Sequence, residues 1–394
     1  MLALILSLIL HVHPGESINA ALDSARAVYA TRSEKTTILI EPGTYQEELT
    51  IDIPGLTLKN ASRKPSIALK NGGVDCDKNA VRITWYYGHG YQYRSMGNRI
   101  NYGGSRERRW NASVLVTAPD FTAENIIFEN SFNLYVSEKE AADSLVDISQ
   151  SDMPWTEKER PKKVMPVRPK KVGSTEVQKK KYRERAAAIS FTEGAKNAHL
   201  KNCRATGRQD VVYGDQGASV YWEGGIIAGS VDFIFGAMTL AVDRATLVAN
   251  VTNEKNDNCY IAAGRSGEPD KPSRGMLFYK CHIRYATNDE LVQGPVVIDR
   301  APNRPYLARP WRWWGETVWA YTTWEKGILN PEGWHVGLVK SKEGYNPENP
   351  CPFSYEYKSQ DGYIGRPKWV SILRKPILPD GTILKPKEWL ISQP

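Results

Sequence analysis

Four segments of the chain share one pattern: a short apolar run, a corner of one or two residues with a small or cysteine side chain, and a second apolar run. These segments begin at Asn197, Ala218, Leu240 and Gly275. The first three recur at about 20–22 residues, and convincing helical periodicity is rare between them. A helix-free repeat of this period is typical of a parallel β-helix, in which successive coils stack as a solenoid. The alternative is a β-sandwich with irregular hairpins, which the scarcity of Asn-Gly and Asp-Gly turns disfavours.

The apolar runs have the length of strands and are rich in β-branched or aromatic residues. Examples are Thr37–Ile40, Ser113–Val116, Ala187–Ser190 and Val231–Phe235. The length of 394 residues would allow two or three domains, but regular β architectures often run long as one domain. The sequence therefore predicts an all-β fold, a right-handed parallel β-helix (solenoid), with a single domain over residues 17–394.

Residues 1–16 allow two interpretations. Met1–Leu10 is apolar enough for the core of a signal peptide, but no basic residue precedes it and no clear cleavage site follows. It is equally suited to a first buried strand, followed by a short amphipathic cap helix at Ser17–Ala27. The segment is too short to span a membrane, and we expect no membrane partner.

A long surface insertion is predicted at about residues 137–184, where Lys, Glu and Pro interrupt the repeat. The segment from Lys158 to Arg185 contains twelve Lys or Arg and three Glu, and this surplus of positive charge accounts for the formal net charge of +8. Such a run is usually a solvated loop, here with one short helix near Glu138–Leu145. No nucleic-acid-binding module is recognisable, so we expect no nucleic-acid partner, and an acidic polysaccharide fits the charge better.

The five cysteines have no metal-site spacing, and in a chain of this length they do not imply a disulfide scaffold. If the others pair, at least one thiol stays free. We therefore expect no metal and no cofactor. Sequons at Asn60, Asn111 and Asn250 are compatible with secretion but are common by chance.

Two aspartates, Asp210 and Asp232, are 22 residues apart, which is about one turn of the predicted β-helix. Equivalent positions on adjacent coils lie roughly 4.8 Å apart. Arg185 precedes Asp210 by 25 residues and so can occupy the coil above, which predicts a column of ionisable groups on one face. Ionising both of two carboxylates this close has a high electrostatic free-energy cost. One of them therefore keeps its proton and can act as a general acid beside a nucleophile. Taken alone, each aspartate also has a structural interpretation.

Four sequence motifs occur in the order Gly43-Thr-Tyr-Gln-Glu47, Gln209-Asp-Val-Val-Tyr213, Asp232-Phe-Ile-Phe-Gly236 and Arg309-Pro-Trp311. Together they resemble the signature of the pectin methylesterase (pectinesterase) family of carbohydrate esterases. Phe353-Ser-Tyr-Glu-Tyr357 is similar to that family's C-terminal motif, so the resemblance runs from about Ser17 to Tyr357. Asp-Phe-Ile-Phe-Gly combined with Arg-Pro-Trp is highly specific, whereas Gly-x-Tyr-x-Glu alone is weak.

The resemblance implies a secreted, extracellular enzyme that hydrolyses the methyl esters of pectin, and we expect a monomer. Asp232 matches the nucleophile that forms an acyl-enzyme with C6 of a methylated galacturonate. Asp210 matches the general acid that protonates methanol and then acts as base on water. Gln209 matches an oxyanion-hole donor, and Arg309 matches the arginine that keeps the nucleophile ionised and oriented.

Aromatic positions also carry over from the resemblance. Trp311 matches a platform on which a sugar ring stacks, and Tyr213 and Phe235 match residues that line the cleft. Trp313 and Trp314 crowd the same loop, and for these two we expect packing roles.

The chain departs from the family pattern at two positions. The family commonly has Gln-Ala-Val-Ala-Leu where this chain has Arg185-Ala-Ala-Ala-Ile189, so Arg185 replaces a second oxyanion donor. Arginine can still donate, and we count Arg185 among the substrate-binding residues, but it can also pair with Asp210 and lower the pKa of that acid. The usual Leu-Gly-Arg-Pro-Trp reads Leu307-Ala-Arg-Pro-Trp here, which is a small change.

Two other functions remain as alternatives. A pectin lyase or hydrolase on a similar β-helix would need a calcium-binding acidic cluster or other paired-Asp motifs, which we do not find. A catalytically silent relative could bind acidic polysaccharide or cleave another ester, with Arg185 as its main support. His89 lies in a Tyr-Gly-His-Gly-Tyr segment. No second pair of metal ligands follows at metal-site spacing, and the chain has no Gly-x-Ser-x-Gly nucleophile elbow. We therefore expect His89 to be a loop or cleft residue and not part of a metal site or a catalytic triad.

Overall fold

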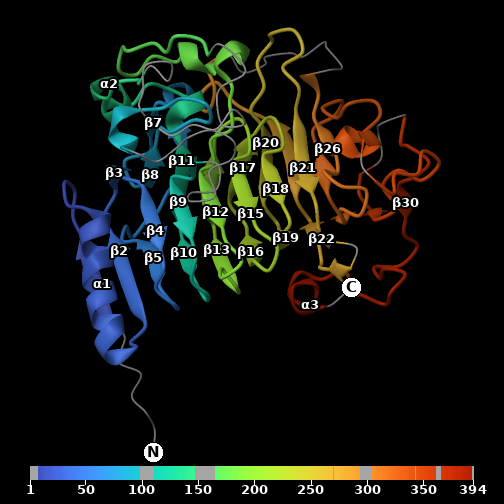
Figure 1. The fold of residues 1–394 in the computed structure, drawn as a ribbon, viewed down its shortest axis with the longest axis horizontal. Helices are drawn as coiled ribbons and strands as arrows, with labels where there is room; N and C mark the ends of the chain where they lie inside the picture. Colours follow the sequence, from blue (N-terminus) through green and yellow to red (C-terminus); the bar gives the residue numbers. More distant parts are fainter. Residues whose placement is uncertain are drawn as a thin grey trace, which may run out of the picture.

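The structure is a computed structural model that describes residues 8–97, 111–146, 165–268, 270–292, 303–341, 343–360 and 365–392. Its coils follow one another from the N-terminal to the C-terminal end of a solenoid (Figure 1). Strands from successive coils stack in parallel into three long sheets, here called sheets A, B and C. Each complete coil adds one strand to each sheet, so residues one coil apart lie side by side.

Sheet A is the largest, and its strands stack in chain order: β1 Leu8–Val12, β2 Thr36–Ile40, β5 Thr57–Asn60, β10 Thr122–Glu124, β13 Ala198–Lys201, β16 Ser219–Glu223, β19 Thr239–Asp243, β24 Met276–Tyr279, β27 Thr317–Ala320, β29 Ser354–Tyr357 and β30 Ser371–Ile372. Sheet B contains β3 Gly43–Gln46, β8 Val81–Trp85, β11 Ile126–Asn130, β14 Arg204–Thr206, β17 Ile226–Gly229, β20 Thr246–Ala249, β25 His282–Tyr285 and β28 Thr323–Trp324. Sheet C contains β4 Leu49–Ile51, β9 Val114–Val116, β12 Ile189–Phe191, β15 Val212–Gly214, β18 Ile234–Gly236, β21 Tyr260–Gly264 and β26 Tyr306–Ala308.

Two short antiparallel pairs lie outside these sheets: β6 Leu69–Lys70 with β7 Asp75–Cys76, and β22 Gly267–Glu268 with β23 Lys271–Pro272. The α-helices are α1 Ile18–Arg32, α2 Glu138–Ala142 and α3 Pro386–Ile391. Single 3₁₀ turns lie at Asn71–Gly73, Arg94–Met96, Ser131–Asn133, Glu176–Gln178, Lys180–Tyr182 and Gly337–Ser341.

The repeat in the sequence corresponds to the turn from sheet A to sheet B. Each of the four repeat segments contains a sheet A strand, a tight corner and a sheet B strand. At these corners one residue adopts the left-handed backbone conformation, with φ of 48° at Asn202, 54° at Arg244 and 53° at Lys280. Because asparagine and glycine adopt this conformation most easily, the short polar corners of the sequence are a physical requirement of the coil.

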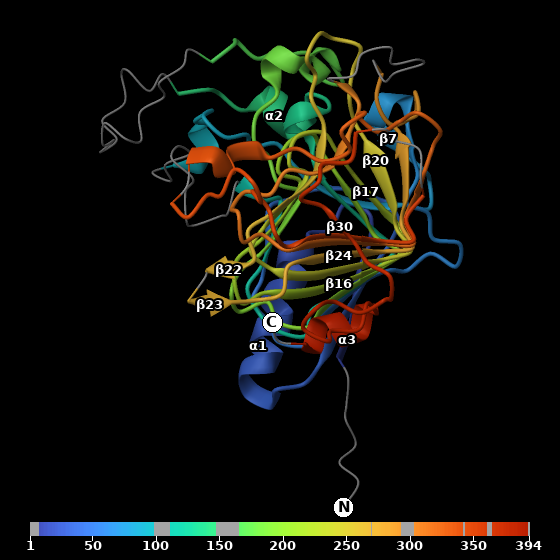
Figure 2. The ribbon, with the colours of Figure 1, turned by 90° about the vertical axis from the view of Figure 1, so that its right-hand side faces the viewer.

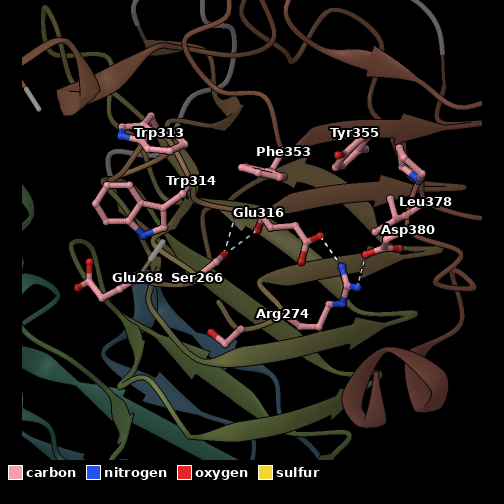
Figure 3. A pocket seen from close by; sticks show the side chains of 12 residues that line it. Ser266, Glu268, Arg274, Trp313, Trp314, Glu316, Phe353, Tyr355, Leu378 and Asp380 are labelled. Atoms are coloured by element: carbon pink, nitrogen blue, oxygen red, sulfur yellow. Dashed lines mark hydrogen bonds and ion pairs between the residues drawn. The ribbon is translucent and has the colours of Figure 1, made fainter. Parts of the chain in front are cut away.

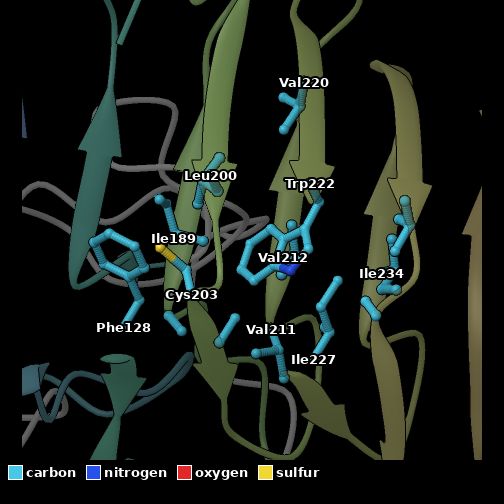
Figure 4. Close-up of a cluster of buried hydrophobic side chains, with 14 of the residues drawn as sticks. Phe128, Ile189, Leu200, Cys203, Val211, Val212, Val220, Trp222, Ile227 and Ile234 are labelled. Carbon is cyan, nitrogen blue, oxygen red and sulfur yellow. The ribbon is translucent and has the colours of Figure 1, made fainter. Parts of the chain in front are cut away.

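The core fills the inside of the solenoid and is lined by inward-facing residues of all three sheets (Figure 4). Leu200, Val212 and Ile227 come from sheets A, C and B of neighbouring coils and are fully buried. At the C-terminal end, Phe278 and Trp319 stack with ring centroids 4.0 Å apart. The same side-chain position therefore recurs coil after coil, as in other solenoids.

The first strand and helix close the N-terminal end of the solenoid. Leu8–Val12 forms β1, which pairs in parallel with β2, and α1 packs Ile18, Leu22 and Ala25 inward. The helix is longer than the predicted Ser17–Ala27 and runs to Arg32. No helix in the described ranges is long and apolar enough to cross a membrane.

The described part of the insertion is more ordered than a solvated loop. Helix α2 begins after Ser137, inside the segment for which a short helix was predicted. Arg168 is 5% exposed, and its guanidinium donates to Glu140 at 2.8 Å. Figure 2 shows α2 and the segment after residue 165 on the side of the molecule opposite α3. The prediction of a solvated basic run is wrong for Arg168, and residues 147–164 lie outside the described ranges.

The structure also places the three sequons and the five cysteines. The side chains of Asn60, Asn111 and Asn250 are buried, at 3%, 3% and 0% exposure, so the three sequons are not accessible acceptors in the folded chain. They therefore carry no argument for secretion. All five cysteines are free, and four of them are buried.

Candidate active site

The two aspartates lie just before neighbouring strands of sheet C. Val212 of β15 pairs with Ile234 of β18, so Asp210 and Asp232 occupy equivalent positions two residues earlier. Both have left-handed backbone, with φ of 56° and 49°. The strand predicted at Val231–Phe235 is therefore wrong at its start, because the chain turns at Asp232 before β18 begins. This stacking confirms the spacing argument, and the turns project both side chains from one face.

Asp232 is held by an arginine from two coils further on. Arg309 donates from Nε and Nη2 to the two carboxylate oxygens of Asp232, each at 2.6 Å. Its guanidinium also lies over the ring of Tyr260, 3.9 Å from the centroid. A bidentate pair of this kind fixes the orientation of the carboxylate and favours its ionised form.

Asp210 has the opposite environment. Its side chain is almost completely buried, and burial followed by the charge of Asp232 raises the pKa of Asp210 well above its ordinary value. The charges of Arg185 and Arg309 act in the other direction but do not reverse the shift. The spacing left open which carboxylate keeps the proton, and the raised pKa favours Asp210.

Gln209 continues the same short ladder. Its backbone bridges to Arg185 on the preceding coil and to Val231 on the following coil. Its side chain is half-buried and makes no hydrogen bond to the described residues, so the amide is available to a ligand. It lies directly before the buried acid Asp210.

Three aromatic rings line the surface beside the aspartates. Tyr213 and Phe235 are paired residues of β15 and β18, with ring centroids 5.1 Å apart. The ring of Trp311 lies 4.6 Å from that of Phe235. Gly236 permits this stacking, because its φ is 121° and a Cβ there would lie 2.1 Å from the carbonyl oxygen of Gly214. The rings form one continuous apolar surface next to the two carboxylates.

The comparison with known proteins finds one family by sequence. The family model described as Pectinesterase matches residues 176–341. Residues 176–341 of this chain are therefore similar to the pectinesterase family.

Curated relatives match over less than half of the chain. A probable pectinesterase/pectinesterase inhibitor from Arabidopsis thaliana is 30% identical over 153 residues, which cover 38% of this chain and 25% of that protein. Pectinesterase 2.2 from Solanum lycopersicum is 28% identical over 147 residues, covering 37% and 25%. The chain thus spans about a quarter of the length of these curated relatives.

The fold comparison covers nearly the whole chain. The pectin methylesterase from Aspergillus niger superimposes with a TM-score of 0.58 at 19% identity, covering 97% of this chain and 94% of the other. A pectin methylesterase solved with a hexasaccharide gives a TM-score of 0.54 at 21% identity, covering 91% and 88%. These similarities support the predicted fold, a right-handed parallel β-helix.

Arg185, where the chain departs from the pectinesterase pattern, reaches the site. Its Nε lies 3.6 Å from Oδ2 of Asp210, and its side chain is 42% exposed. It aligns in register with Gln209 and not with Asp210, so the predicted column is shifted by one residue at this coil. The pairing with Asp210 that the sequence suggested is present.

The two outer pectinesterase motifs have structural roles in this chain. Glu47 accepts hydrogen bonds from the backbone N–H groups of Ile18 and Asn19 at 2.9 and 3.0 Å, and so caps the N-terminus of α1. Glu356 is 2% exposed and accepts from Nε1 of Trp334 at 2.8 Å. Neither motif supplies a group to the two aspartates.

Sequence reasoning missed three residues beside the aspartates. The register of β18 with β21 places Tyr260 one coil beyond Asp232, and Tyr306 follows in the next coil, with the two rings stacked 5.2 Å apart. The ring of His335 lies 5.3 Å from that of Tyr306, and burial followed by the charge of Arg309 lowers the pKa of His335. Tyr306 directly precedes the Leu-Ala-Arg-Pro-Trp motif, so its position was the available signal.

His89 lies in a loop, one of the two placements predicted for it, and it is close to Arg185. Its backbone N–H donates to the carbonyl oxygen of Arg185 at 2.9 Å. Burial and then the charge of Arg185 lower the pKa of His89 to about 4. Within the described ranges, no group of three or more His, Cys, Asp or Glu side chains is arranged to hold a metal ion.

Proposed function

We propose that this protein hydrolyses the methyl esters of pectin through a covalent intermediate on Asp232. The observation that carries the proposal is the contrast between two stacked carboxylates. Asp232 forms a bidentate ion pair with Arg309, and Asp210 is buried and has a raised pKa. A carboxylate paired with a cation, next to a buried carboxyl group, gives the division of roles that nucleophilic and acid–base catalysis need.

In the first step, the Asp232 carboxylate attacks the C6 carbonyl carbon of a methyl-esterified galacturonate. The bidentate contact with Arg309 engages both carboxylate oxygens and fixes the orientation of the carboxylate, and each oxygen keeps a further lone pair for attack. As the tetrahedral intermediate collapses, the bond from C6 to the methoxy oxygen breaks. Asp210 donates its proton to that oxygen, methanol leaves, and Asp232 remains joined to C6 as an anhydride.

In the second step, Asp210 is a carboxylate and can act as a base. It takes a proton from a water molecule that attacks C6 of the anhydride. The bond between C6 and Asp232 then breaks, which restores the ionised Asp232 and the protonated Asp210. The product is a galacturonic acid unit, which loses its proton to solvent.

The negative charge that develops on the C6 carbonyl oxygen needs donors. The side-chain amide of Gln209 and the guanidinium of Arg185 flank Asp210 and are the groups we assign to this role. A donor aimed at the developing charge is typically worth about 3–4 kcal/mol of the activation barrier. A charged donor such as Arg185 stabilises an oxyanion more than a neutral amide does.

Pectin is the proposed substrate because the site has aromatic rings and cations side by side. Tyr213, Phe235 and Trp311 offer flat apolar surfaces that fit the C–H faces of sugar rings. Arg185 and Arg309 provide positive charge near the position where each turnover creates a carboxylate. The similarity to a pectin methylesterase solved with a hexasaccharide supports a polysaccharide substrate. We further propose that the protein acts outside the cell, where pectin occurs, and as a monomer.

A silent, pectin-binding relative is the second candidate, and the contact between Arg185 and Asp210 is the observation that favours it. That contact would blunt an acid if it lowered the pKa of Asp210 to its ordinary range. Burial and Asp232 outweigh it, so the pKa of Asp210 remains raised. We therefore favour an active enzyme.

The test measures methanol release and viscosity on the same sample of highly methylated pectin. An esterase releases methanol while the viscosity of a calcium-free solution stays constant, because no glycosidic bond is cleaved. Loss of viscosity with little methanol would indicate a lyase or hydrolase. Binding of pectin without either change would support the silent relative and refute the proposal.

A further inference from the structure

Three segments of the chain meet at one buried carboxylate, that of Asp257. They are the end of the insertion, the coil that carries Asp210 and the loop before Tyr260. The side chain of Asp257 is fully buried. One carboxylate oxygen accepts a hydrogen bond from the guanidinium of Arg183, and the other accepts from Nη2 of Arg208 at 2.7 Å. Because both arginines share one anion, the three segments are joined at a single point, here called the Asp257 junction.

The hydrogen bonds at the junction favour an ionised Asp257. The backbone N–H and the hydroxyl of Thr252 donate to its Oδ2 atom at 2.6 and 2.8 Å. Burial raises the pKa of Asp257, but the charges of Arg208 and Arg183 outweigh burial, and the pKa lies below its ordinary value. Removing the carboxylate would leave two arginines without their anion, which is strongly destabilising. The junction is therefore a fixed point of the fold.

The junction lies very close in sequence to the donors and the acid of the site. Arg183 precedes Arg185 by two residues, and Gln209 alone separates Arg208 from Asp210. The backbones of Arg185 and Gln209 bridge each other on adjacent coils. A segment of two residues spans at most about 7 Å, so the position of Arg183 limits where Arg185 can lie.

Arg208 is the immobile side of the junction. Its side chain is fully buried, and Nη1 donates to the carbonyl oxygen of Gln178. Its own carbonyl oxygen accepts from the N–H and the hydroxyl of Ser230 at 2.6 and 2.8 Å, and Ser230 precedes Asp232 by two residues. The coils of the two aspartates are thus tied together independently of Arg183, which is partly exposed.

We propose that the ion pair of Arg183 and Asp257 is a positioning element for Arg185. By fixing the backbone two residues before Arg185, the pair keeps that guanidinium beside Asp210. Arg185 is long and largely exposed, so without a fixed backbone its side chain would spread over many positions. The inference rests on the proposed function and adds to it a pair of residues that acts on the oxyanion donor from behind.

Ion clusters also stabilise parts of the fold that supply no group to the reaction. Figure 3 shows Arg274 between Glu316 and Asp380, beside a cavity of about 390 Å³. Arg274 donates to Glu316 at 2.7 Å and also to Asp380. None of these three residues lies within two positions of a residue assigned to the site. Burial of an ion cluster alone therefore does not indicate a positioning role, and the short connection to Arg185 is what distinguishes Asp257.

A cluster with the same composition as the junction provides a matched control. Glu290 accepts from Arg204 at 3.0 Å and from Arg284 at 2.6 Å. Arg204 is buried and Arg284 is partly exposed, which is also true of Arg208 and Arg183 respectively. No member of the Glu290 cluster lies within two positions of a residue assigned to the site.

The pKa of Asp210 reports the position of Arg185. Burial is the largest influence on this pKa and raises it. Among the charges that face Asp210, that of Asp232 raises the pKa, and those of Arg185 and Arg309 lower it. Asp232 and Arg309 hold each other in a bidentate pair at 2.6 Å, so their contributions stay in place when the insertion changes. Movement of Arg185 away from Asp210 therefore raises the pKa.

The experiment removes the partly exposed arginine of each cluster, with Arg183→Met as the test variant and Arg284→Met as its control. Each variant keeps the buried arginine and its carboxylate as a pair, so neither leaves an unpaired charge. Both substitutions are also made in an Arg185→Gln background. The pKa of Asp210 is measured by NMR of its carboxyl carbon, whose signal is assigned by its absence from Asp210→Asn protein. This measurement does not require turnover.

We expect Arg183→Met to raise the pKa of Asp210 by about half a pH unit when Arg185 is present, and to leave it unchanged in the Arg185→Gln background. Arg284→Met should leave this pKa unchanged in both backgrounds, although both variants lower the melting temperature. An equal rise in both backgrounds would mean that Arg183 acts through its own charge, and it would overturn the proposal. Absence of any rise would overturn it as well.

Methanol release separates this inference from the proposed function. At saturating pectin, kcat of Arg183→Met should fall about tenfold, because a misplaced donor stabilises the oxyanion less well. In Arg185→Ala protein the same substitution should cause no further fall, and a further fall would contradict a route through Arg185. If the parent releases no methanol, the esterase is refuted, and the pKa of Asp210 still decides the positioning role. If it releases methanol but the pKa pattern is absent, only the positioning role is refuted.

Discussion

Substitution of Arg185 tests whether the residue that distinguishes this chain is part of the oxyanion site. Arg185→Ala removes the donor, and Arg185→Gln replaces it by the neutral amide that the family commonly has. Loss of one donor at an oxyanion typically costs about 2.7–4 kcal/mol. Because the side chain is 42% exposed and its Nε is 3.6 Å from Asp210, solvent screens it and the lower end applies. We expect kcat of Arg185→Ala to fall about a hundredfold.

Arg185→Gln should keep most of kcat, within about tenfold of the parent, because an amide still donates to the oxyanion. Both substitutions remove a charge that lowers the pKa of Asp210. Since the acid must be protonated, activity is lost as the pH rises through the pKa of Asp210. The alkaline limb of the pH–activity profile should therefore move to higher pH in both variants.

The assay is methanol release at saturating pectin across pH, with the melting temperature of each variant as the control for folding. The two readouts separate the roles: the pH limb reports the charge, and the difference in kcat between Ala and Gln reports the donor. Equal and nearly full kcat values for both variants, with only the melting temperature changed, would remove Arg185 from the site.

Three further predictions follow from the charges and ligands of the site. Asp210→Asn should abolish turnover yet raise the melting temperature at pH 7. The raised pKa of Asp210 stabilises the folded state below about pH 4, and this stabilisation is lost as the pH rises; a melting temperature that does not rise at pH 7 would contradict the buried acid. His89→Gln should make the fold less sensitive to acid. Because the pKa of His89 is lowered to about 4, the parent loses about 3 kcal/mol of unfolding free energy as the pH falls from 6.5; unfolding curves of the variant that match those of the parent at both pH 4 and pH 7 would refute this. Turnover should be unaffected by EDTA, and activity that disappears and returns with calcium or zinc would contradict a metal-free mechanism.

The regular part of the fold was predictable because coils of nearly constant length place equivalent residues side by side. The spacing of 22 residues between Asp210 and Asp232 is such a coil, and the structure stacks them as expected. The coil before Asp210 is less regular, so Arg185 aligns with Gln209 and the predicted register is off by one residue. Spacing alone cannot reveal where a coil gains a residue.

The later part of the site was less predictable because long loops separate its coils. Tyr260 follows Asp232 by 28 residues, and Tyr306 follows Tyr260 by 46, so no period connects them. Arg309 reaches back to Asp232 across two coils, and only the family resemblance pointed to that pair. The pKa of Asp210 also depends on burial and on three neighbouring charges, which a sequence does not place in space.

The central claim is that Asp232 is the nucleophile, and Asp232→Asn tests it most directly. The amide keeps the size of the side chain but removes the anion that attacks C6 and pairs with Arg309. The measurement is methanol release from highly methylated pectin by the purified variant, with circular dichroism to establish that the fold is intact. We predict that a folded Asp232→Asn protein releases no methanol above background. Release of more than about a hundredth of the parent rate by that folded protein would contradict the assignment, since loss of a nucleophile costs far more than a hundredfold.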